Sequence, residues 1–265
     1  MANIHPSSVV EPGARIAESA TVGPFCYVGA DVTIGEGTVL MSHVNVHGAT
    51  DIGRNNKIYA NASVGCDPQD KKYAGEKTRL TIGDDNVIRE NVTISTGTVQ
   101  DEGVTRIGSR NLIMANVHIA HDCVLADDII MSVGAGLAGH VHVDSFAVLG
   151  GLAGVHQFVR IGRHVMIGGL SAIRMDVPPF VICAGNPAEP FGLNIVGLRR
   201  AGYDLEAINA LKLAYAAVYR EGLSVRQACD RLDELALADS AHAKDIRAMH
   251  EFIAASDRGL VRPKG

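Results

Sequence analysis

The chain has 265 residues and a formal net charge of −5, with 47% hydrophobic residues, 5% aromatic residues and no Trp. The acidic balance argues against a general nucleic-acid binder, and no apolar run of about 18 residues is present to span a membrane. The start, MANIHPSSVVEPG, lacks the basic and apolar regions of a signal peptide. Five widely spaced Cys fit a reducing, cytoplasmic environment better than a disulfide framework.

A six-residue repeat begins at Ile4 and organises about two thirds of the chain. An aliphatic residue recurs at every sixth position, a small or aliphatic residue follows four places on, and Gly often comes directly after the aliphatic one. A period of six matches neither an α-helix nor a plain strand alternation. It predicts short strands joined by tight corners, and three hexads would form a coil of about 18 residues. Successive coils would pair as parallel strands about 4.8 Å apart.

Two segments interrupt the repeat, and we expect both to be loops. The first covers about residues 69–81, where a continued repeat would bury the carboxylates of Asp70 and Glu76 without partners. The second covers about residues 96–106, where the chain has more residues than a hexad needs. Both loops leave from the face that carries His121. Long loops on a rigid frame are more often functional than structural, so this face is the expected site.

The stretch NVHIAHDC follows the second loop and carries the most informative residues. A coil of about 18 residues places Gly139, and then Gln157, over His121. It also places His140 over Asp122, with all of these side chains pointing outward at one edge. A His accepts a proton near neutral pH, Asp122 would fix its tautomer, and the N–H of Gly139 would face an oxyanion. The edge therefore predicts acyl transfer with His121, Asp122 and Gly139 as the catalytic residues.

The repeat ends where four Pro cluster in RMDVPPFVICAGNPAEPFG, because Pro lacks the N–H that a paired strand donates. Helical spacing follows over 205–220, with Asp204 as the expected N-cap, and Ser224 is positioned to begin a second helix. A third helix is expected over 244–256. The chain thus divides into a β domain over residues 1–185 and a helical domain over residues 186–265.

Similarity to known proteins extends well beyond the hexads, through VGPFCYVG, QDKKYAGE, NLIMANVHIAHDC, LAGHVHVD, GVHQF and PFGLNIVGLRR. These segments resemble the UDP-N-acetylglucosamine O-acyltransferases, hexapeptide-repeat enzymes that catalyse the first step of lipid A biosynthesis. The resemblance implies an all-β left-handed parallel β-helix with a C-terminal α-helical domain. It implies transfer of an R-3-hydroxyacyl group from acyl carrier protein to the glucosamine 3-hydroxyl of UDP-N-acetylglucosamine. It also implies a cytoplasmic homotrimer with sites between subunits, and we expect no cofactor and no metal ion.

The resemblance assigns a role to individual residues. His121 matches the general base, Asp122 its partner and Gly139 the oxyanion donor. The positions expected to bind substrate are Asp70, Lys72, His118, His140, His156, Gln157, Gly169, Asn194 and Arg200. Among these, Gly169 implies an open acyl groove and a longer acyl chain. Val196 and Ala201 stand where the family often has an acidic and a basic residue, so fewer nucleotide contacts are expected from that segment.

Three other functions account for part of the sequence. A related N-acyltransferase also has a His base on this fold, but it usually carries a domain ahead of the repeat, which here begins at Ile4. A zinc lyase of the carbonic anhydrase type would use the same histidines as metal ligands, but it lacks an extended helical region. A non-catalytic solenoid that binds a partner would leave the histidines as solvated surface residues.

Overall fold

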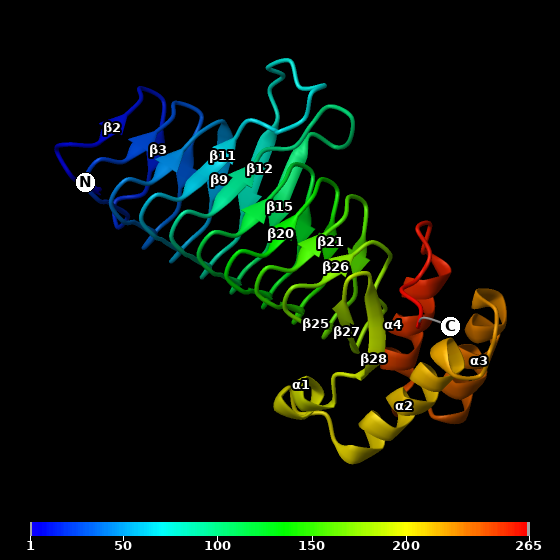
Figure 1. Cartoon of the computed structure of the whole chain (residues 1–265). Helices are drawn as coiled ribbons and strands as arrows, with labels where there is room; N and C mark the ends of the chain where they lie inside the picture. The colour runs from blue at the N-terminus through cyan, green and yellow to red at the C-terminus, as the bar shows by residue number, and fades with distance from the viewer. Residues whose placement is uncertain (1, 264–265) are drawn as a thin grey trace.

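The computed structural model describes residues 2–263 as a three-sided prism of short strands, with four helices at its C-terminal end (Figure 1). Each coil contributes one strand to each of three sheets, and strands of neighbouring coils pair in parallel. The fold is therefore the expected left-handed parallel β-helix. None of the helices within the described residues is long and apolar enough to cross a membrane.

The three sheets form the three faces of the prism. The first sheet contains β1 (Asn3–Ile4), β4 (Thr21–Val22), β7 (Val39–Leu40), β10 (Lys57–Ile58), β13 (Val87–Ile88), β16 (Leu112–Ile113), β19 (Ile130–Met131), β22 (Val148–Leu149), β25 (Met166–Ile167), β27 (Val181–Gly185) and β28 (Ala188–Leu193). The second contains β2 (Val9–Val10), β5 (Tyr27–Val28), β8 (Asn45–Val46), β11 (Ser63–Cys66), β14 (Thr93–Ser95), β17 (His118–Ile119), β20 (Gly136–Leu137), β23 (Gly154–Val155) and β26 (Ala172–Ile173). The third contains β3 (Arg15–Ile16), β6 (Thr33–Ile34), β9 (Ala49–Ile52), β12 (Arg79–Ile82), β15 (Val104–Ile107), β18 (Val124–Leu125), β21 (His142–Val143) and β24 (Arg160–Ile161).

Pairing between uninterrupted coils follows the expected register. His118 of β17 lies opposite Gly136 of β20, which is 18 residues further along the chain (136 − 118). The register widens where loops intervene, and Ala49 of β9 lies opposite Arg79 of β12. β12 begins at Arg79 and β15 at Val104, so strand pairing resumes inside the spans 69–81 and 96–106 that the sequence suggested as loops. Both loops project from the prism (Figure 1).

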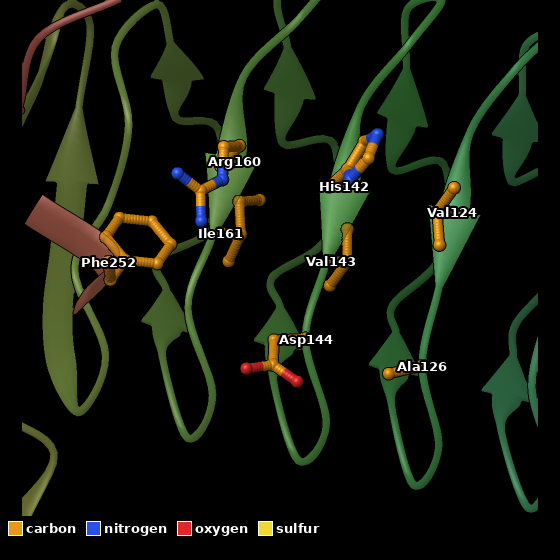
Figure 2. A pocket seen from close by; sticks show the side chains of 8 residues that line it. All are labelled: Val124, Ala126, His142, Val143, Asp144, Arg160, Ile161 and Phe252. Carbon is orange, nitrogen blue, oxygen red and sulfur yellow. The ribbon is translucent and has the colours of Figure 1, made fainter. Parts of the chain in front are cut away.

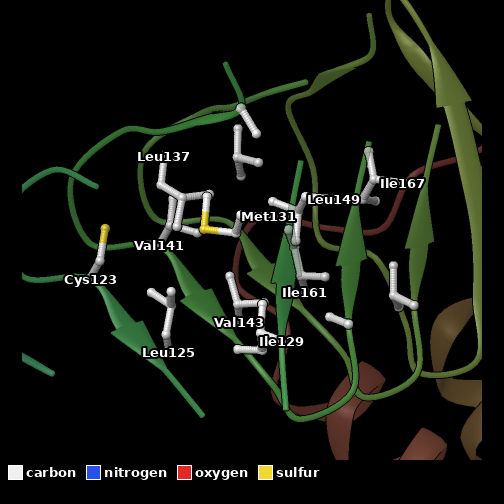
Figure 3. Packing of buried hydrophobic residues seen from close by; sticks show 14 of the residues in the cluster. Cys123, Leu125, Ile129, Met131, Leu137, Val141, Val143, Leu149, Ile161 and Ile167 are labelled. Atoms are coloured by element: carbon white, nitrogen blue, oxygen red, sulfur yellow. The ribbon is translucent and has the colours of Figure 1, made fainter. Parts of the chain in front are cut away.

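The repeated aliphatic positions fill the interior of the prism in layers. Met131, Leu137, Leu149 and Ile161 pack together in successive coils and are almost completely buried (Figure 3). β-Branched and straight aliphatic side chains suit this narrow space, because each coil offers only a few inward positions. Cys123 occupies one of these positions and is fully buried, as the hexad register predicts.

A buried polar column interrupts this apolar interior at the corner between the third and first sheets. Asn56, Asn86 and Asn111 stack in successive coils, and each amide oxygen accepts a hydrogen bond from the backbone N–H of the next coil, at 2.7–2.9 Å. The Asn86 amide nitrogen also donates to Asn56 Oδ1 at 3.0 Å and to the carbonyl of Gly108 at 2.9 Å. The column therefore satisfies polar groups that would otherwise be buried without partners.

The Pro-rich segment forms a β-hairpin before the helices begin. β27 pairs in parallel with β25 and antiparallel with β28, so residues 188–193 extend the first sheet within the region 186–265 expected to be helical. Four helices follow, namely α1 (Ile195–Arg200), α2 (Leu205–Tyr219), α3 (Val225–Ala238) and α4 (Ala243–Ala254). Asp204 caps α2, and Ser224 caps α3 with a reciprocal bond to Gln227, so both predicted N-caps are confirmed.

Candidate active site

His121 and Asp122 lie at the corner between the second and third sheets, directly after β17. Asp122 has a positive φ of 58°, a conformation that Asp tolerates better than most residues because its short side chain bonds locally. Its carboxylate is buried, and Oδ2 lies 2.8 Å from His121 Nδ1. The His121 side chain remains partly exposed at 13%. The corner thus places an imidazole at the surface and its carboxylate partner beneath it.

The second loop closes over this carboxylate. The Thr98 backbone N–H donates to Asp122 Oδ1 at 2.7 Å, and the Thr98 hydroxyl donates to Oδ2 at 2.6 Å. The Asp122 N–H in turn donates to Thr105 Oγ1 at 2.8 Å. These residues were not singled out from the sequence, because nothing in a local motif indicates which loop residue returns to a corner in another coil.

Gly139 lies one coil above His121, and its lack of a side chain is required there. A Cβ added at position 139 would lie 2.5 Å from His121 Cε1 and 2.7 Å from Nε2, closer than non-bonded atoms approach. Gly139 is buried against the His121 ring, and its N–H donates to no acceptor among the described residues. The geometry therefore pairs a basic ring with a free amide donor, as an oxyanion site requires.

His140 lies in the same coil as Gly139 and contacts four side chains. Its Nδ1 is 2.7 Å from Asp101 Oδ2 in the second loop, and its Nε2 is 3.8 Å from Asp122 Oδ2. Its ring stacks on Phe158 with centroids 4.3 Å apart and meets the His121 ring edge-on at 5.1 Å. The hydrogen bond from His140 holds the pKa of Asp101 below its usual range. Phe158 was not identified from the sequence as a site residue, although its position 18 residues after His140 places it one coil further along the same corner.

The remaining histidines of this edge lie on the second sheet. His118 Nδ1 is 2.7 Å from Thr93 Oγ1, and burial, followed by the charge of His121, lowers the pKa of His118 below its ordinary value. His118 is therefore a neutral hydrogen-bonding group near pH 7. His156 follows β23, two coils beyond His118, and is exposed, with its Nδ1 3.3 Å from the guanidinium of Arg258. Gln157 follows it at the exposed corner.

A cavity of about 510 Å³ begins at His140 and runs along the third sheet toward the helices. Its lining includes Asp101, Phe158, Arg160 and Arg258. A smaller cavity of about 220 Å³ adjoins it, and Figure 2 shows Arg160 and Phe252 at one end of that cavity, with His142 on the neighbouring strand. The Arg160 guanidinium lies over the Phe252 ring, with its Cζ 4.6 Å from the ring centroid. The corner thus opens into a groove with cationic and aromatic walls.

Other expected substrate-binding residues make no hydrogen bond or ion pair with His121 among residues 2–263, although the first loop leaves the same corner between β11 and β12. Asp70 and Lys72 occupy the first loop, where the Lys72 N–H donates to Asp70 Oδ1 at 3.0 Å and the Lys72 side chain is exposed. Gly169 is exposed at the corner between the first and second sheets, where its neighbour Leu170 donates to the carbonyl of Gly151. A single chain therefore does not bring Gly169 to His121.

Asn194 and Arg200 lie at the two ends of α1, beside the first sheet. The Asn194 side chain accepts from the N–H of Gly197 and donates to the carbonyl of His164, so it caps the helix and anchors it to the prism. Arg200 is exposed and lines a separate cavity of about 600 Å³ with Arg163 and Tyr203. This cavity carries positive charge but belongs to a different face from His121.

His121, Asp122 and His140 also form a group that could offer three ligand atoms to a metal ion, all within 4.8 Å of one another. Two imidazole nitrogens and a carboxylate oxygen suit zinc. However, His121 Nδ1 and Asp122 Oδ2 already bond to each other, and both carboxylate oxygens accept from Thr98. The Asp122 carboxylate is thus already occupied by three hydrogen bonds, so the donor set fits a hydrogen-bonded base better.

Comparisons with known proteins identify close relatives. A family model described as "Udp N-acetylglucosamine O-acyltransferase; Domain 2" matches residues 176–261. The chain is 53% identical, over 262 residues, to an acyl-[acyl-carrier-protein]–UDP-N-acetylglucosamine O-acyltransferase of Burkholderia orbicola, covering 99% of this chain and 100% of that protein. It matches the UDP-N-acetylglucosamine O-acyltransferase structure of Moraxella catarrhalis with a TM-score of 0.95, 49% identity and coverage of 98% and 99%. The acyltransferase structure of Francisella novicida gives a TM-score of 0.95, 41% identity and coverage of 99% and 95%.

Proposed function

Because the chain belongs to the UDP-N-acetylglucosamine O-acyltransferase family, we propose that it transfers an R-3-hydroxyacyl group from acyl carrier protein to the glucosamine 3-hydroxyl of UDP-N-acetylglucosamine. The Burkholderia orbicola relative is named for O-acyl transfer between acyl carrier protein and UDP-N-acetylglucosamine, and the Moraxella catarrhalis structure for O-acyl transfer with the same sugar nucleotide. The proposed reaction is the first step of lipid A biosynthesis. Membership of an O-acyltransferase family weighs against the N-acyltransferase, the zinc lyase and the binding scaffold. The reaction is proposed to take place in the cytoplasm.

In the proposed mechanism His121 is the general base. Its Nε2 removes the proton of the sugar 3-hydroxyl while the oxygen attacks the thioester carbonyl carbon. The resulting oxyanion accepts a hydrogen bond from the Gly139 N–H, and Asp122 stabilises the imidazolium through Nδ1. The carbon–sulfur bond then breaks, and the imidazolium returns its proton to the leaving thiolate. The observation that carries this mechanism is the alignment of Asp122, His121 and Gly139 in two successive coils.

Substrate binding is proposed to use residues of neighbouring subunits in a homotrimer. Gly169, Asn194 and Arg200 lie on faces that do not meet His121 within one chain, so a second prism packed alongside would complete the site. Asn194 would act by fixing α1, and Arg200 at its last turn would face the diphosphate. Lys72 would neutralise the same diphosphate from the first loop as a point charge.

His118, His140, His156 and Gln157 are proposed to contact the sugar and the acyl donor along the catalytic edge. Asp70 is proposed to hold the sugar from the first loop. The absence of a side chain at Gly169 is proposed to admit a longer acyl chain, and an added Cβ there would lie only 3.2 Å from the carbonyl oxygen of Gly151.

One assay tests the proposal directly. The protein is incubated with UDP-N-acetylglucosamine and R-3-hydroxyacyl carrier protein, with and without a chelator, and the product is analysed by mass spectrometry for an alkali-labile ester. We expect ester formation in both conditions. An amide product, activity that requires zinc, or no acyl transfer at all would contradict the proposal.

The base is tested with His121→Ala. General-base catalysis contributes about 10²–10⁴-fold, so kcat should fall by that factor. Circular dichroism should remain unchanged, since the side chain lies outside the packed interior. Near-normal turnover in this variant would remove His121 from the mechanism. Light scattering at three times the mass of one chain would support the homotrimer.

A further inference from the structure

We infer that Thr98 is a positioning residue, which orients the His121–Asp122 pair through two hydrogen bonds from the second loop. The inference builds on the proposed role of His121 as the general base. Thr98 lies 24 residues before Asp122 in the chain, and only the path of the second loop brings the two together.

The contacts of the Asp122 carboxylate carry the inference. Thr98 provides a donor to each carboxylate oxygen, from its N–H to Oδ1 at 2.7 Å and from its hydroxyl to Oδ2 at 2.6 Å. His121 Nδ1 shares Oδ2 at 2.8 Å. Within residues 2–263, no Lys or Arg forms an ion pair with Asp122, which is only 3% exposed. Hydrogen bonds therefore stabilise this buried charge, and Thr98 supplies two of them.

These contacts determine which His121 nitrogen carries the proton. The Thr98 backbone N–H can only donate, so Oδ1 must accept, and an ionised carboxylate satisfies all three donors at once. Asp122 then accepts from His121, which places the proton on Nδ1 and leaves the Nε2 lone pair free beside Gly139. Thr98 also fixes the rotation of the Asp122 carboxylate, because its backbone N–H binds one carboxylate oxygen and its hydroxyl binds the other.

Removal of the Thr98 hydroxyl should change both the rate and its pH dependence. An Oδ2 that loses one donor becomes a stronger acceptor for His121 and stabilises the imidazolium. The other titratable groups facing the ring are His118 on β17 and His140 in the next coil, which Asp101 contacts in turn. They are unchanged by the substitution, so a shift in the acid limb reports on the Asp122–His121 bond.

Thr96 provides a matched control within the same loop. Its hydroxyl bonds to Thr78 Oγ1 at 3.0 Å, and both side chains are buried. Thr96→Val therefore removes a buried threonine hydroxyl that anchors the loop without contacting Asp122. A variant that acts only by loosening the loop should resemble this control.

The experiment compares Thr98→Val, Thr98→Ser and Thr96→Val in the complete enzyme. In Thr98→Val we expect kcat to fall about tenfold or more, as for loss of a hydrogen bond to a charged group. The KM for UDP-N-acetylglucosamine should remain unchanged, and the acid limb of the kcat profile should move to higher pH. Thr98→Ser keeps the hydroxyl, so its kcat and its acid limb should match those of the unaltered enzyme. If Thr98→Val and Thr96→Val share the same kcat and the same acid limb, the inference is overturned.

A measurement on the unaltered enzyme covers the case in which Thr98→Val does not fold. Nitrogen-15 NMR of the histidine rings at pH 8 should show His121 protonated at Nδ1 and not at Nε2, assigned by loss of the signal in His121→Ala. The opposite tautomer would overturn the inference. If the Thr98 variants overturn the inference while His121→Ala is inactive, the proposed base is left intact. An active His121→Ala would remove the proposed mechanism itself.

Discussion

Two corners of the prism stack polar residues in the same coil-to-coil register and use them in opposite ways. At the corner between the third and first sheets, Asn56, Asn86 and Asn111 point inward, are almost fully buried, and bond to one another and to the backbone of the next coil. At the corner between the second and third sheets, the His121 ring points outward over Gly139. We call these the inward column and the outward corner.

The difference shows that stacking by itself does not determine function. Both corners repeat at the spacing of paired strands, about 4.8 Å. In the inward column each donor finds an acceptor in a neighbouring coil, so the hydrogen bonds serve stability. At the outward corner, among residues 2–263, the Gly139 N–H has no acceptor and His121 bonds only through Nδ1, so donor and acceptor capacity remains for a ligand. Four predictions test this contrast, from the largest expected effect to the smallest.

Gly139→Ala should abolish most activity while leaving the fold intact. The added Cβ would meet His121 Cε1 at 2.5 Å, and the ring, lying at the surface, would swing away. Misplacement of a reacting group by about 1 Å costs about 100-fold in rate, so we expect at least that loss in kcat. Gly154→Ala is the control, because an added Cβ there meets nothing within 4 Å. Equal kinetics for the two variants would contradict the geometry of the outward corner.

Asn86→Ala should affect stability and leave the chemistry alone. The change removes the acceptor for the Asn111 N–H and the donor to Gly108, and it leaves buried polar groups unpaired. A loss of about 2 kcal/mol in the free energy of unfolding is expected from urea denaturation. Asn209→Ala on the exposed side of α2 should cost nothing. An Asn86→Ala variant whose free energy of unfolding is unchanged, or one that is folded but inactive, would contradict the assignment of the inward column to stability.

Lys72→Ala tests whether the outward corner extends onto the first loop. Loss of a point charge facing the diphosphate should raise the KM for UDP-N-acetylglucosamine about tenfold, within the range for hydrogen bonds to charged groups, with kcat little changed. Lys77→Ala alters an equally exposed lysine of the same loop and should leave KM unchanged. Steady-state kinetics on both variants would show whether the KM depends on the position of Lys72 or only on the number of positive charges in the loop. An equal KM in the two variants would contradict the prediction.

His164→Phe should have the smallest of the four effects, a change in how the free energy of unfolding depends on pH. Burial, followed by the charge of Arg163, lowers the pKa of His164 below its ordinary value. The unfolded chain therefore binds a proton more readily than the folded chain, and this contribution to stability is present above about pH 6.5 and is lost as the pH falls below it. Phe would keep the stack on Phe146, whose ring lies 4.7 Å away, and remove the titration.

Urea denaturation at pH 7.5 and pH 5.5 measures this difference. The variant should lose less stability than the unaltered protein between the two pH values. His5→Phe, at an exposed position, should not change the loss. An identical pH dependence in His164→Phe and the unaltered protein would show that His164 does not contribute.

The sequence by itself determined the repeat, the three faces, the stacking of Gly139 over His121 and the caps at Asp204 and Ser224. Each of these follows from local spacing, because a fixed coil length converts distance along the chain into a position on the prism. Tertiary structure decided which loop residues return to the corner. Thr98 and Asp101 reach Asp122 and His140 through an irregular loop that has no period from which to count. It also decided that Asn194 caps a helix and anchors that helix to the prism, since this depends on how separate elements pack.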